Sequence, residues 1–142
     1  MKTLAWPCPA PGGSGEEFAA IAGPDDAPAR VLIVPALFDE ANKSRRLLAQ
    51  TMRLLAERGV ASVLPDLPGC GESLAPLELQ DIASWRTAVR KCVRHFGATH
   101  FLAIRGGAIL LPRGANGWSF EPVGGAAQLR TMARARTIAA RE

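Results

Sequence analysis

The sequence predicts an α/β fold, a three-layer α/β/α sandwich around a mainly parallel sheet. Short aliphatic and β-branched runs alternate with segments in which apolar residues recur at helical spacing, and the connections between them are short. Such an order favours parallel strands joined by right-handed crossovers. With 142 residues, 48% of them hydrophobic and 21% charged, the chain suits one globular domain rather than a disordered segment. We therefore expect a single domain over residues 1–142.

Composition and charge argue against several classes of protein. No apolar run reaches the roughly 20 residues of a membrane-spanning helix, and Pro7, Pro9 and Pro11 interrupt the N-terminus where a signal peptide would be apolar. We expect a cytoplasmic protein. The three cysteines show no metal-ligand spacing and fit reduced thiols, so neither a metal nor another cofactor is expected. The net charge of +4 permits an anionic small-molecule ligand, and we expect no nucleic-acid binding.

The N-terminal segment, residues 1–29, is rich in proline, glycine and alanine, and residues 11–15 have the composition of a turn. We expect this segment to be rich in loops, with residues 17–21 as one strand of a hairpin. Residues 30–35 (R-V-L-I-V-P) then form a continuous aliphatic run. Its length and composition are typical of a strand buried on both faces, as in a parallel sheet.

The first helix is predicted over residues 43–58. Asn42 or Ser44 could cap its beginning, and Gly59 would end it. Its apolar residues fall at helical spacing and are Leu47, Leu48, Met52, Leu55 and Ala56. Residues 61–64 form the next expected strand, which the proline-rich residues 65–69 stop.

A second helix is predicted over residues 81–96. Its buried face is marked by Ile82, Trp85, Val89, Cys92, Val93 and Phe96. Arg86, Arg90 and Arg94 are spaced by four and line another face, which we expect to be solvated. Gly97 closes the helix, and residues 100–104 form the third aliphatic strand.

Residues 101–111 (F-L-A-I-R-G-G-A-I-L-L) join the end of that strand to a glycine pair. This pattern is typical of a buried strand that turns sharply into the next element, because glycine fits where a side chain would clash. Little room follows for a helix before residue 118.

Residues 118–123 are predicted as a strand near the edge of the sheet. An exposed edge strand favours pairing with another chain. That chain could be a second copy, in a homo-oligomer, or a different protein partner. Residues 128–141 are predicted as a terminal helix with Arg130, Arg134 and Arg141 on one side. The apolar residues opposite these arginines are small, so we do not expect the helix to insert into a membrane surface.

With these elements in order, the sequence resembles the α/β-hydrolase superfamily in a minimal form. The resemblance begins at V-L-I-V-P-A-L-F-D-E (31–40) and continues in P-D-L-P-G-C-G-E-S (65–73), which is similar to the D-x-x-G-x-G-x-S loop of that superfamily. It ends at the turn that contains Arg105. The resemblance implies that the loop after residues 30–35 supplies an oxyanion-hole amide, and that the turn carries a nucleophile.

A narrower resemblance covers about residues 30–140. The segments F-D-E-A-N-K-S-R-R (38–46), A-I-R-G-G-A (103–108) and E-P-V-G-G-A-A-Q-L-R (121–130) are similar to the family of exosortase A system-associated hydrolase 2. In that family a similar E-x-N-K-x-R-R segment precedes the first helix, and an arginine-bearing segment lies at the turn. The resemblance implies a Gram-negative bacterium and genes for exosortase sorting and exopolysaccharide.

The residues that the superfamily uses for catalysis are missing from their usual places. In the pattern G-x-S-x-G the serine position is taken by Arg105, and arginine stays protonated because its pKa exceeds about 12. His95 and His100 both precede the turn, whereas the catalytic histidine of this fold follows the nucleophile. Ser73 and Cys70 lie on the 65–73 loop, where a structural serine and an inert thiol are favoured. We therefore expect no serine-hydrolase activity, and we assign no catalytic residue.

The candidate ligand site lies at the carboxyl ends of the strands, where open α/β sheets bind ligands. Its residues are Arg105, Gly106, Leu37, Phe38, Asp39 and Asp66. Arg105 could hold a carboxylate or phosphate of a ligand, or it could pair with Asp39, Glu40 or Asp66. Asp66 could also brace its own turn.

Two functions remain open at this point. One is an accessory or ligand-binding protein that has the hydrolase fold without serine-hydrolase chemistry. The other is a hydrolase or acyltransferase that acts on an ester, thioester or phosphorylated substrate through an unconventional site around Arg105.

Overall fold

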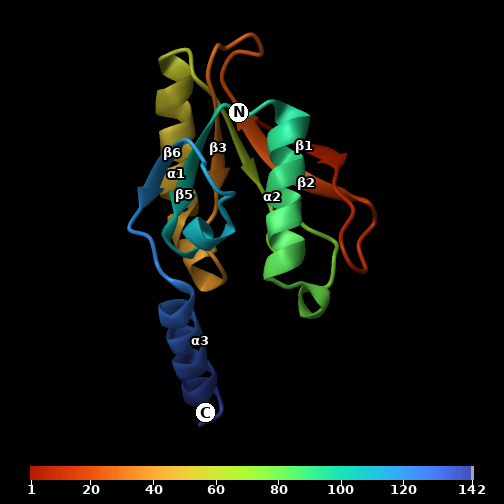
Figure 1. Ribbon diagram of the computed structural model, residues 1–142, viewed down its shortest axis with the longest axis vertical. Coiled ribbons are helices and arrows are strands. Elements are labelled where there is room, and N and C mark those ends of the chain that lie inside the picture. Colours follow the sequence, from red (N-terminus) through yellow and green to blue (C-terminus); the bar gives the residue numbers. More distant parts are fainter. Residues whose placement is uncertain (142) are drawn as a thin grey trace.

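The computed structural model describes residues 1–141 and contains one sheet of six strands, in the order β1-β2-β4-β3-β5-β6 (Figure 1). The strands are β1 Lys2–Pro7, β2 Glu16–Ala22, β3 Arg30–Val34, β4 Ala61–Pro65, β5 His100–Ile104 and β6 Gly117–Phe120. The helices of this part of the chain are α1 Asp39–Glu57, α2 Ile82–Phe96 and α3 Gly125–Ala139, with two 3-10 helices, η1 Leu77–Leu79 and η2 Arg105–Leu110. β3, β4, β5 and β6 run parallel, and β2 is antiparallel to both β1 and β4. The expected mainly parallel sheet is confirmed.

Side chains of β3 alternate between two separate cores, which explains the continuous aliphatic sequence of this strand. Leu32 and Val34 pack in the core that α2 covers, and Val31 and Ile33 pack in the core that α1 covers. A strand with a helix over each face needs apolar residues at every position. The three-layer α/β/α architecture is therefore confirmed.

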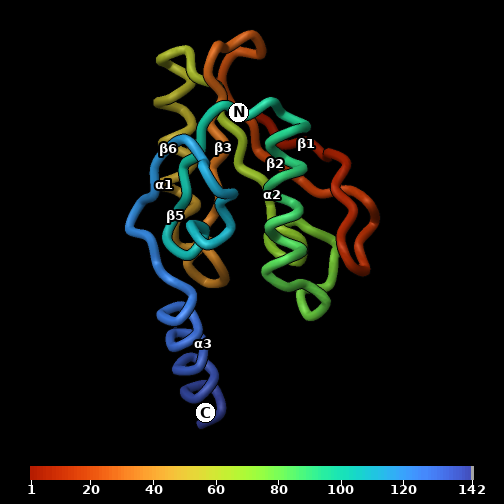
Figure 2. Tube along the Cα trace, in the orientation of Figure 1, coloured from red at the N-terminus to blue at the C-terminus, as the bar shows by residue number. Residues whose placement is uncertain are grey.

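Residues 1–29 contain a hairpin of β1 and β2, so the expected hairpin is confirmed. Residues 8–15 and 23–29 lie outside the strands, which agrees with the expected richness in loops. β2 covers the predicted strand at residues 17–21 and extends beyond it at both ends. Trp6 and Cys8 are each 1% exposed, while their neighbours in sequence are exposed. This period-two alternation is the strand signal, and proline and glycine obscure it in the composition. The hairpin joins the sheet through β2 and β4, as the chain path in Figure 2 shows.

α1 begins at Asp39, four residues before the predicted start at residue 43. The predicted caps, Asn42 and Ser44, are wrong because both lie inside the helix, where the Ser44 hydroxyl donates to the Glu40 carbonyl oxygen at 2.9 Å. The N-cap is instead Phe38, which has φ 58 and no side-chain cap. Tertiary packing of the loop after β3 therefore decides where α1 starts.

α2 agrees with its predicted bounds to one residue. The Ser84 amide donates to the Asp81 carboxylate at 2.7 Å, and the Asp81 amide donates to the Ser84 hydroxyl at 3.0 Å. This reciprocal capping box satisfies two amides that the helix leaves free. Gly97, with φ 65, ends the helix as predicted.

Two residues of the two long helices differ from their predicted environment. Leu47 in α1 and Ile82 in α2 were predicted to be buried, and they are 47% and 36% exposed. Arg86 is exposed, as predicted, and its guanidinium also donates two hydrogen bonds, at 2.9 and 3.1 Å, to the carbonyl oxygen of Ile109 in η2. Arg86 thereby ties α2 to the segment that follows β5.

β6 and α3 also differ from the predicted bounds. The strand expected at residues 118–123 is limited to Gly117–Phe120, because Glu121 takes φ 43 and turns the chain away. The helix expected at residues 128–141 begins at Gly125 and ends at Ala139. α3 projects from the carboxyl end of the sheet, and Gln128 is its one buried residue (Figure 1).

Candidate functional site

The turn after β5 has the sharp geometry that the glycine pair predicts. Ile104 is extended with φ −108, and Arg105 changes at once to φ 49, from which η2 begins. A positive φ is uncommon for a residue with a long side chain. The chain thus keeps a strained strand-to-helix turn at the position where the pattern would have a serine.

The glycine pair lets the turn approach the loop that follows β3. A Cβ on Gly107 would collide with the carbonyl oxygen of Pro35 and lie 2.8 Å from that of Val34. A Cβ on Gly106 would lie 3.3 Å from Leu37 Cδ1 and 2.6 Å from Gln128 Oε1. Gly106 and Leu37, predicted to share a site, are therefore neighbours. Gln128 is a further site residue that no sequence signal indicated, since it comes from the projecting α3.

Arg105 is bound by two carboxylates. Its Nε and one Nη donate to Glu40 Oε2 and Oε1, each at 3.3 Å, which is a bidentate pair. The other Nη donates to the Glu121 carbonyl oxygen at 3.3 Å and lies 3.7 Å from Glu121 Oε2. These hydrogen bonds and charges, Glu40 first, raise the pKa of the guanidinium above its already high ordinary value. Of the three predicted partners Glu40 is correct, and Glu121 was missed.

Three non-glycine residues in the described chain have positive φ, and all three lie around this ion cluster. They are Phe38 at 58°, Arg105 at 49° and Glu121 at 43°. Phe38 is two residues before Glu40, and Glu121 accepts from Arg105 through its own carbonyl. Backbone strain of this kind persists where the surrounding structure enforces it, and it gathers at functional sites. We name Glu40, Arg105 and Glu121 the elbow ion cluster.

Two other predicted site residues, Phe38 and Asp39, have different environments. The Phe38 ring packs on Trp85 of α2 with centroids 5.6 Å apart, so it bridges the loop after β3 to that helix. Asp39 is exposed in the first turn of α1, where a negative charge is favourable at the helix N-terminus. The structure does not bring Asp39 into contact with Arg105.

Asp66 braces its own loop, one of its two predicted roles. Its Oδ2 accepts a hydrogen bond from the Glu72 amide at 3.0 Å, and burial raises its pKa. The Ser73 hydroxyl is fully used on the same loop: it accepts from the Gly69 and Ala75 amides at 2.8 and 3.2 Å. The predicted structural role of Ser73 is confirmed.

A cavity of about 780 Å³ lies beside the predicted site rather than within it. It is lined mainly by apolar side chains of α1, β2 and β4, and Leu37, Asp66 and Cys70 also line it. Arg105 and Gly106 are not among its lining residues. Of the predicted site residues, Arg105 therefore belongs to the elbow ion cluster, and Leu37 and Asp66 line this cavity.

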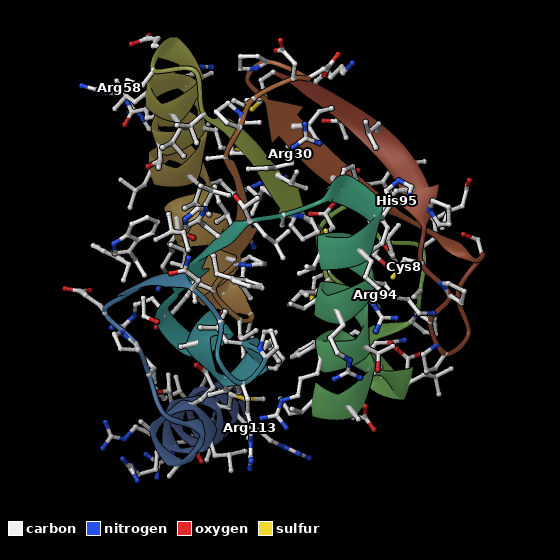
Figure 3. All side chains as sticks on the ribbon, turned by 45° about the horizontal axis from the view of Figure 1, so that its top comes forward. Cys8, Arg30, Arg58, Arg94, His95 and Arg113 are labelled. Carbon is white, nitrogen blue, oxygen red and sulfur yellow. The ribbon has the colours of Figure 1, made fainter. Side chains whose placement is uncertain are left out.

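Neither histidine is placed to serve a nucleophile at Arg105. His100 is the first residue of β5, so about 16 Å of strand, at about 3.3 Å per residue, separate it from Arg105. Its ring stacks on Trp118 with centroids 6.0 Å apart. His95 lies near the C-terminal end of α2 (Figure 3), with its ring 5.7 Å from that of Trp6.

Within residues 1–141, no group of three His, Cys, Asp or Glu side chains is arranged to hold a metal ion. No helix of this part of the chain has both the length and the hydrophobicity that a membrane crossing requires.

The sequence matches no protein-family model and no curated protein. Solved structures do match. An epoxide hydrolase from Vigna radiata has a TM-score of 0.59 at 23% identity, over 77% of this chain and 33% of the other. Est1E from Butyrivibrio proteoclasticus, solved with ferulic acid, has a TM-score of 0.59 at 20% identity, over 75% and 44%. The thioesterase domain from the curacin biosynthetic pathway has a TM-score of 0.58 at 17% identity, over 78% and 40%.

These likenesses, together with the strand order, show a minimal form of the α/β-hydrolase fold. The chain spans 33% to 44% of the length of the three solved chains. In that fold the strand-to-helix turn of the pattern G-x-S-x-G carries the nucleophile, and the turn at Arg105 also joins a strand to a helix.

Proposed function

We propose that this chain is a cytoplasmic accessory or ligand-binding protein of the exosortase-associated type, in which the α/β-hydrolase fold has lost serine-hydrolase chemistry. The observation that carries the proposal is Arg105, which stands at the nucleophile position with its guanidinium bound by Glu40 and Glu121. A group that is held there by two carboxylates braces the site instead of reacting in it.

No nucleophile replaces the missing serine at this turn. A protonated guanidinium offers no lone pair to a carbonyl carbon. The Ser73 hydroxyl accepts two amide hydrogen bonds and donates its proton to Glu17 Oε1 at 2.9 Å, so attack would require this network to break. Burial raises the pKa of Cys70, and the charges of Asp66 and Glu17 raise it further, which disfavours the reactive thiolate.

The two arms of the elbow ion cluster are unequal, which supports a role in ligand binding. Glu40 holds Arg105 through two bonds and has a side chain 30% exposed, whereas Glu121 lies at 3.7 Å and is 67% exposed. A ligand carboxylate or phosphate could displace the Glu121 side chain while Glu40 keeps the guanidinium in place. The ligand class that fits is therefore a small anion.

The elbow ion cluster also supports the narrower family proposal. Glu40 belongs to the segment 38–46, Arg105 to the segment 103–108, and Glu121 begins the segment 121–130. Each of the three segments that carry the resemblance to the exosortase-associated hydrolases thus contributes one member of the same ion cluster. Contact within one ion cluster is a physical reason for the three segments to occur together in one sequence.

The proposal is tested by a fluorophosphonate probe and by titration with small anions. We expect no covalent labelling of the wild-type chain. We expect acetate or phosphate binding to weaken at least tenfold in Arg105→Ala, and to strengthen severalfold in Glu121→Gln because the competing carboxylate is removed. Glu78→Gln, remote from Arg105, is the control for the charge change. Covalent labelling of the wild type that Ser73→Ala abolishes would overturn the proposal. So would anion affinities that are unchanged in both Arg105→Ala and Glu121→Gln.

A second candidate is a hydrolase or acyltransferase for an ester, thioester or phosphorylated substrate, with Arg105 as electrophile. One observation favours it: the strained turn and the close approach of Gly106 to Leu37 are retained although the serine is absent. In this candidate Arg105 could equally hold an anionic group of the substrate. The candidate requires wild-type turnover of short acyl esters or phosphoesters that Arg105→Ala abolishes while the fold stays intact. Equal rates in wild type and variant would eliminate it.

A further inference from the structure

The loop between β4 and α2 presents an acidic and apolar surface. Between residues 59 and 85 the sequence contains four acidic residues and neither lysine nor arginine. Glu72 and Glu78 are exposed there. Three leucines on the same loop are exposed as well: Leu74 by 73%, Leu77 by 44% and Leu79 by 54%. We name residues 66–81 the acidic loop.

α3 presents the complementary surface. Residues 125–141 contain four arginines and no acidic residue. The arginines are Arg130, Arg134, Arg136 and Arg141, all exposed. Leu129 and Ile138 are 67% and 60% exposed on the same helix, so its exposed apolar residues are not all small, contrary to the prediction. Large apolar side chains on a projecting helix are typical of a surface that binds a protein.

Both surfaces lie at the carboxyl end of the sheet, but they do not meet within one molecule. In Figure 1 the acidic loop and α3 extend toward the same end, on opposite sides of the body. α3 contacts the rest of the described chain chiefly at η2, where Gln128 approaches Gly106. The remainder of the helix points away: residues 129–141 are all exposed, and Figure 3 shows side chains extending around the helix.

We propose that two copies of this chain form a two-fold dimer in which α3 of each protomer lies along the acidic loop of the other. A two-fold axis makes both contacts at once, because each protomer supplies one surface of each kind. The 15-residue helix is about 22 Å long, which suits two contacts of a standard-sized interface, about 1,200–2,000 Å² in total. The opposite charges of α3 and the acidic loop favour this pairing. Contacts between two α3 helices, or between two acidic loops, would bring like charges together.

The test is the mass of the full chain in solution, by light scattering at low and high salt. We expect about twice the monomer mass of 15.0 kDa at low salt and a shift toward monomer at high salt. The helix variant Arg130→Glu/Arg134→Glu and the loop variant Glu72→Lys/Glu78→Lys should each be monomeric, with at least tenfold weaker association. Mixed together they should form a heterodimer, because the substituted residues of α3 and loop then face each other with opposite charges in one contact, and the other contact keeps its wild-type charges.

A matched variant controls for net charge. Arg90→Glu/Arg94→Glu on the exposed face of α2 makes the same charge change as the helix variant and should leave the dimer intact. Thermal unfolding monitored by circular dichroism checks that every variant is folded. A monomeric wild type at high concentration and low salt would overturn the proposal, as would a monomer in which α3 closes on its own acidic loop. Failure of the mixed variants to associate would overturn it too.

Discussion

Glu17 is a buried carboxylate inside the sheet, 1% exposed in β2. Its Oε1 accepts the Ser73 hydroxyl proton at 2.9 Å, while Oε2 has no hydrogen-bond partner among the described residues. Burial raises the pKa of Glu17, the Ser73 hydrogen bond opposes this, and the charge of Asp66 adds to it. The same carboxylate helps to raise the pKa of Cys8 to about 11, after burial, which is the larger cause. Glu17 therefore joins the hairpin to the loop 65–73 at the cost of an incompletely satisfied carboxylate.

The raised pKa of Glu17 predicts a pH dependence of stability. The folded state binds the Glu17 proton more tightly than the unfolded state, so this contribution is fully present below the ordinary pKa near 4.5 and is lost as pH rises through the folded pKa. Glu17→Gln removes the titrating carboxyl, so it should abolish this part of the loss of stability with rising pH. The free energy of unfolding of the variant, relative to wild type, should therefore increase between pH 4.5 and 7.5, as measured by urea denaturation.

Glu16→Gln is the matched control, because Glu16 is the exposed neighbour of Glu17 on the same strand. Its difference from wild type should stay constant over the same range. A Glu17→Gln difference that is equal at both ends of the range would contradict the assignment.

At the scale of single elements, α2 is the helix whose beginning is set locally. Asp81 and Ser84 form its reciprocal capping box, and Trp85 then fixes the helix to the preceding loop by donating to the Pro68 carbonyl oxygen at 2.9 Å. α1 has no side-chain cap, and its first turn instead carries Glu40 into the elbow ion cluster. The two helices thus start for different physical reasons.

Asp81→Ala should lower the free energy of unfolding by about 1 kcal/mol, because the Ser84 amide loses its acceptor at the helix N-terminus. Asp81→Asn keeps a side-chain oxygen at that position and should cost a few tenths of a kcal/mol at most. Chemical denaturation of both variants measures the difference. Equal losses in the two would indicate that the capping hydrogen bond contributes little.

At the scale of the whole molecule, the sheet separates two cores that share strands but not helices. Ile33 is fully buried in the core of α1, and Val89 is 1% exposed in the core of α2. Independent sites more than about 7–10 Å apart have additive effects on stability. The sheet is therefore expected to isolate substitutions on its two faces from one another.

Ile33→Val should cost about 0.5–1.5 kcal/mol, and Val89→Ala about 1.5–3 kcal/mol. In the double variant the losses in unfolding free energy should add to within about 0.5 kcal/mol. Val34→Ala combined with Val89→Ala is the comparison within one core, where shared neighbours should make the losses deviate from additivity. Strong coupling across the sheet, measured by urea denaturation of each single and double variant, would refute the separation.

Local signals in the sequence determined the elements. The aliphatic run of β3, the helical spacing and Gly97 of α2, and the glycine pair after Arg105 each act within a few residues, so the fold class and the position of the turn could be predicted from them. The absence of serine from that turn was also readable from the sequence. The start of α1 and the extent of the hairpin were not, because packing of distant segments decides both.

Tertiary structure alone decided what Arg105 does. Its carboxylate partners are 65 and 16 residues away, and the Glu17–Ser73 bond spans 56 residues. Several carboxylates were equally plausible partners in the sequence, since no local pattern encodes which one the crossovers bring within hydrogen-bonding distance. The sequence therefore determined where the arginine stands, and the meeting of three strand ends determined that Glu40 and Glu121 hold it.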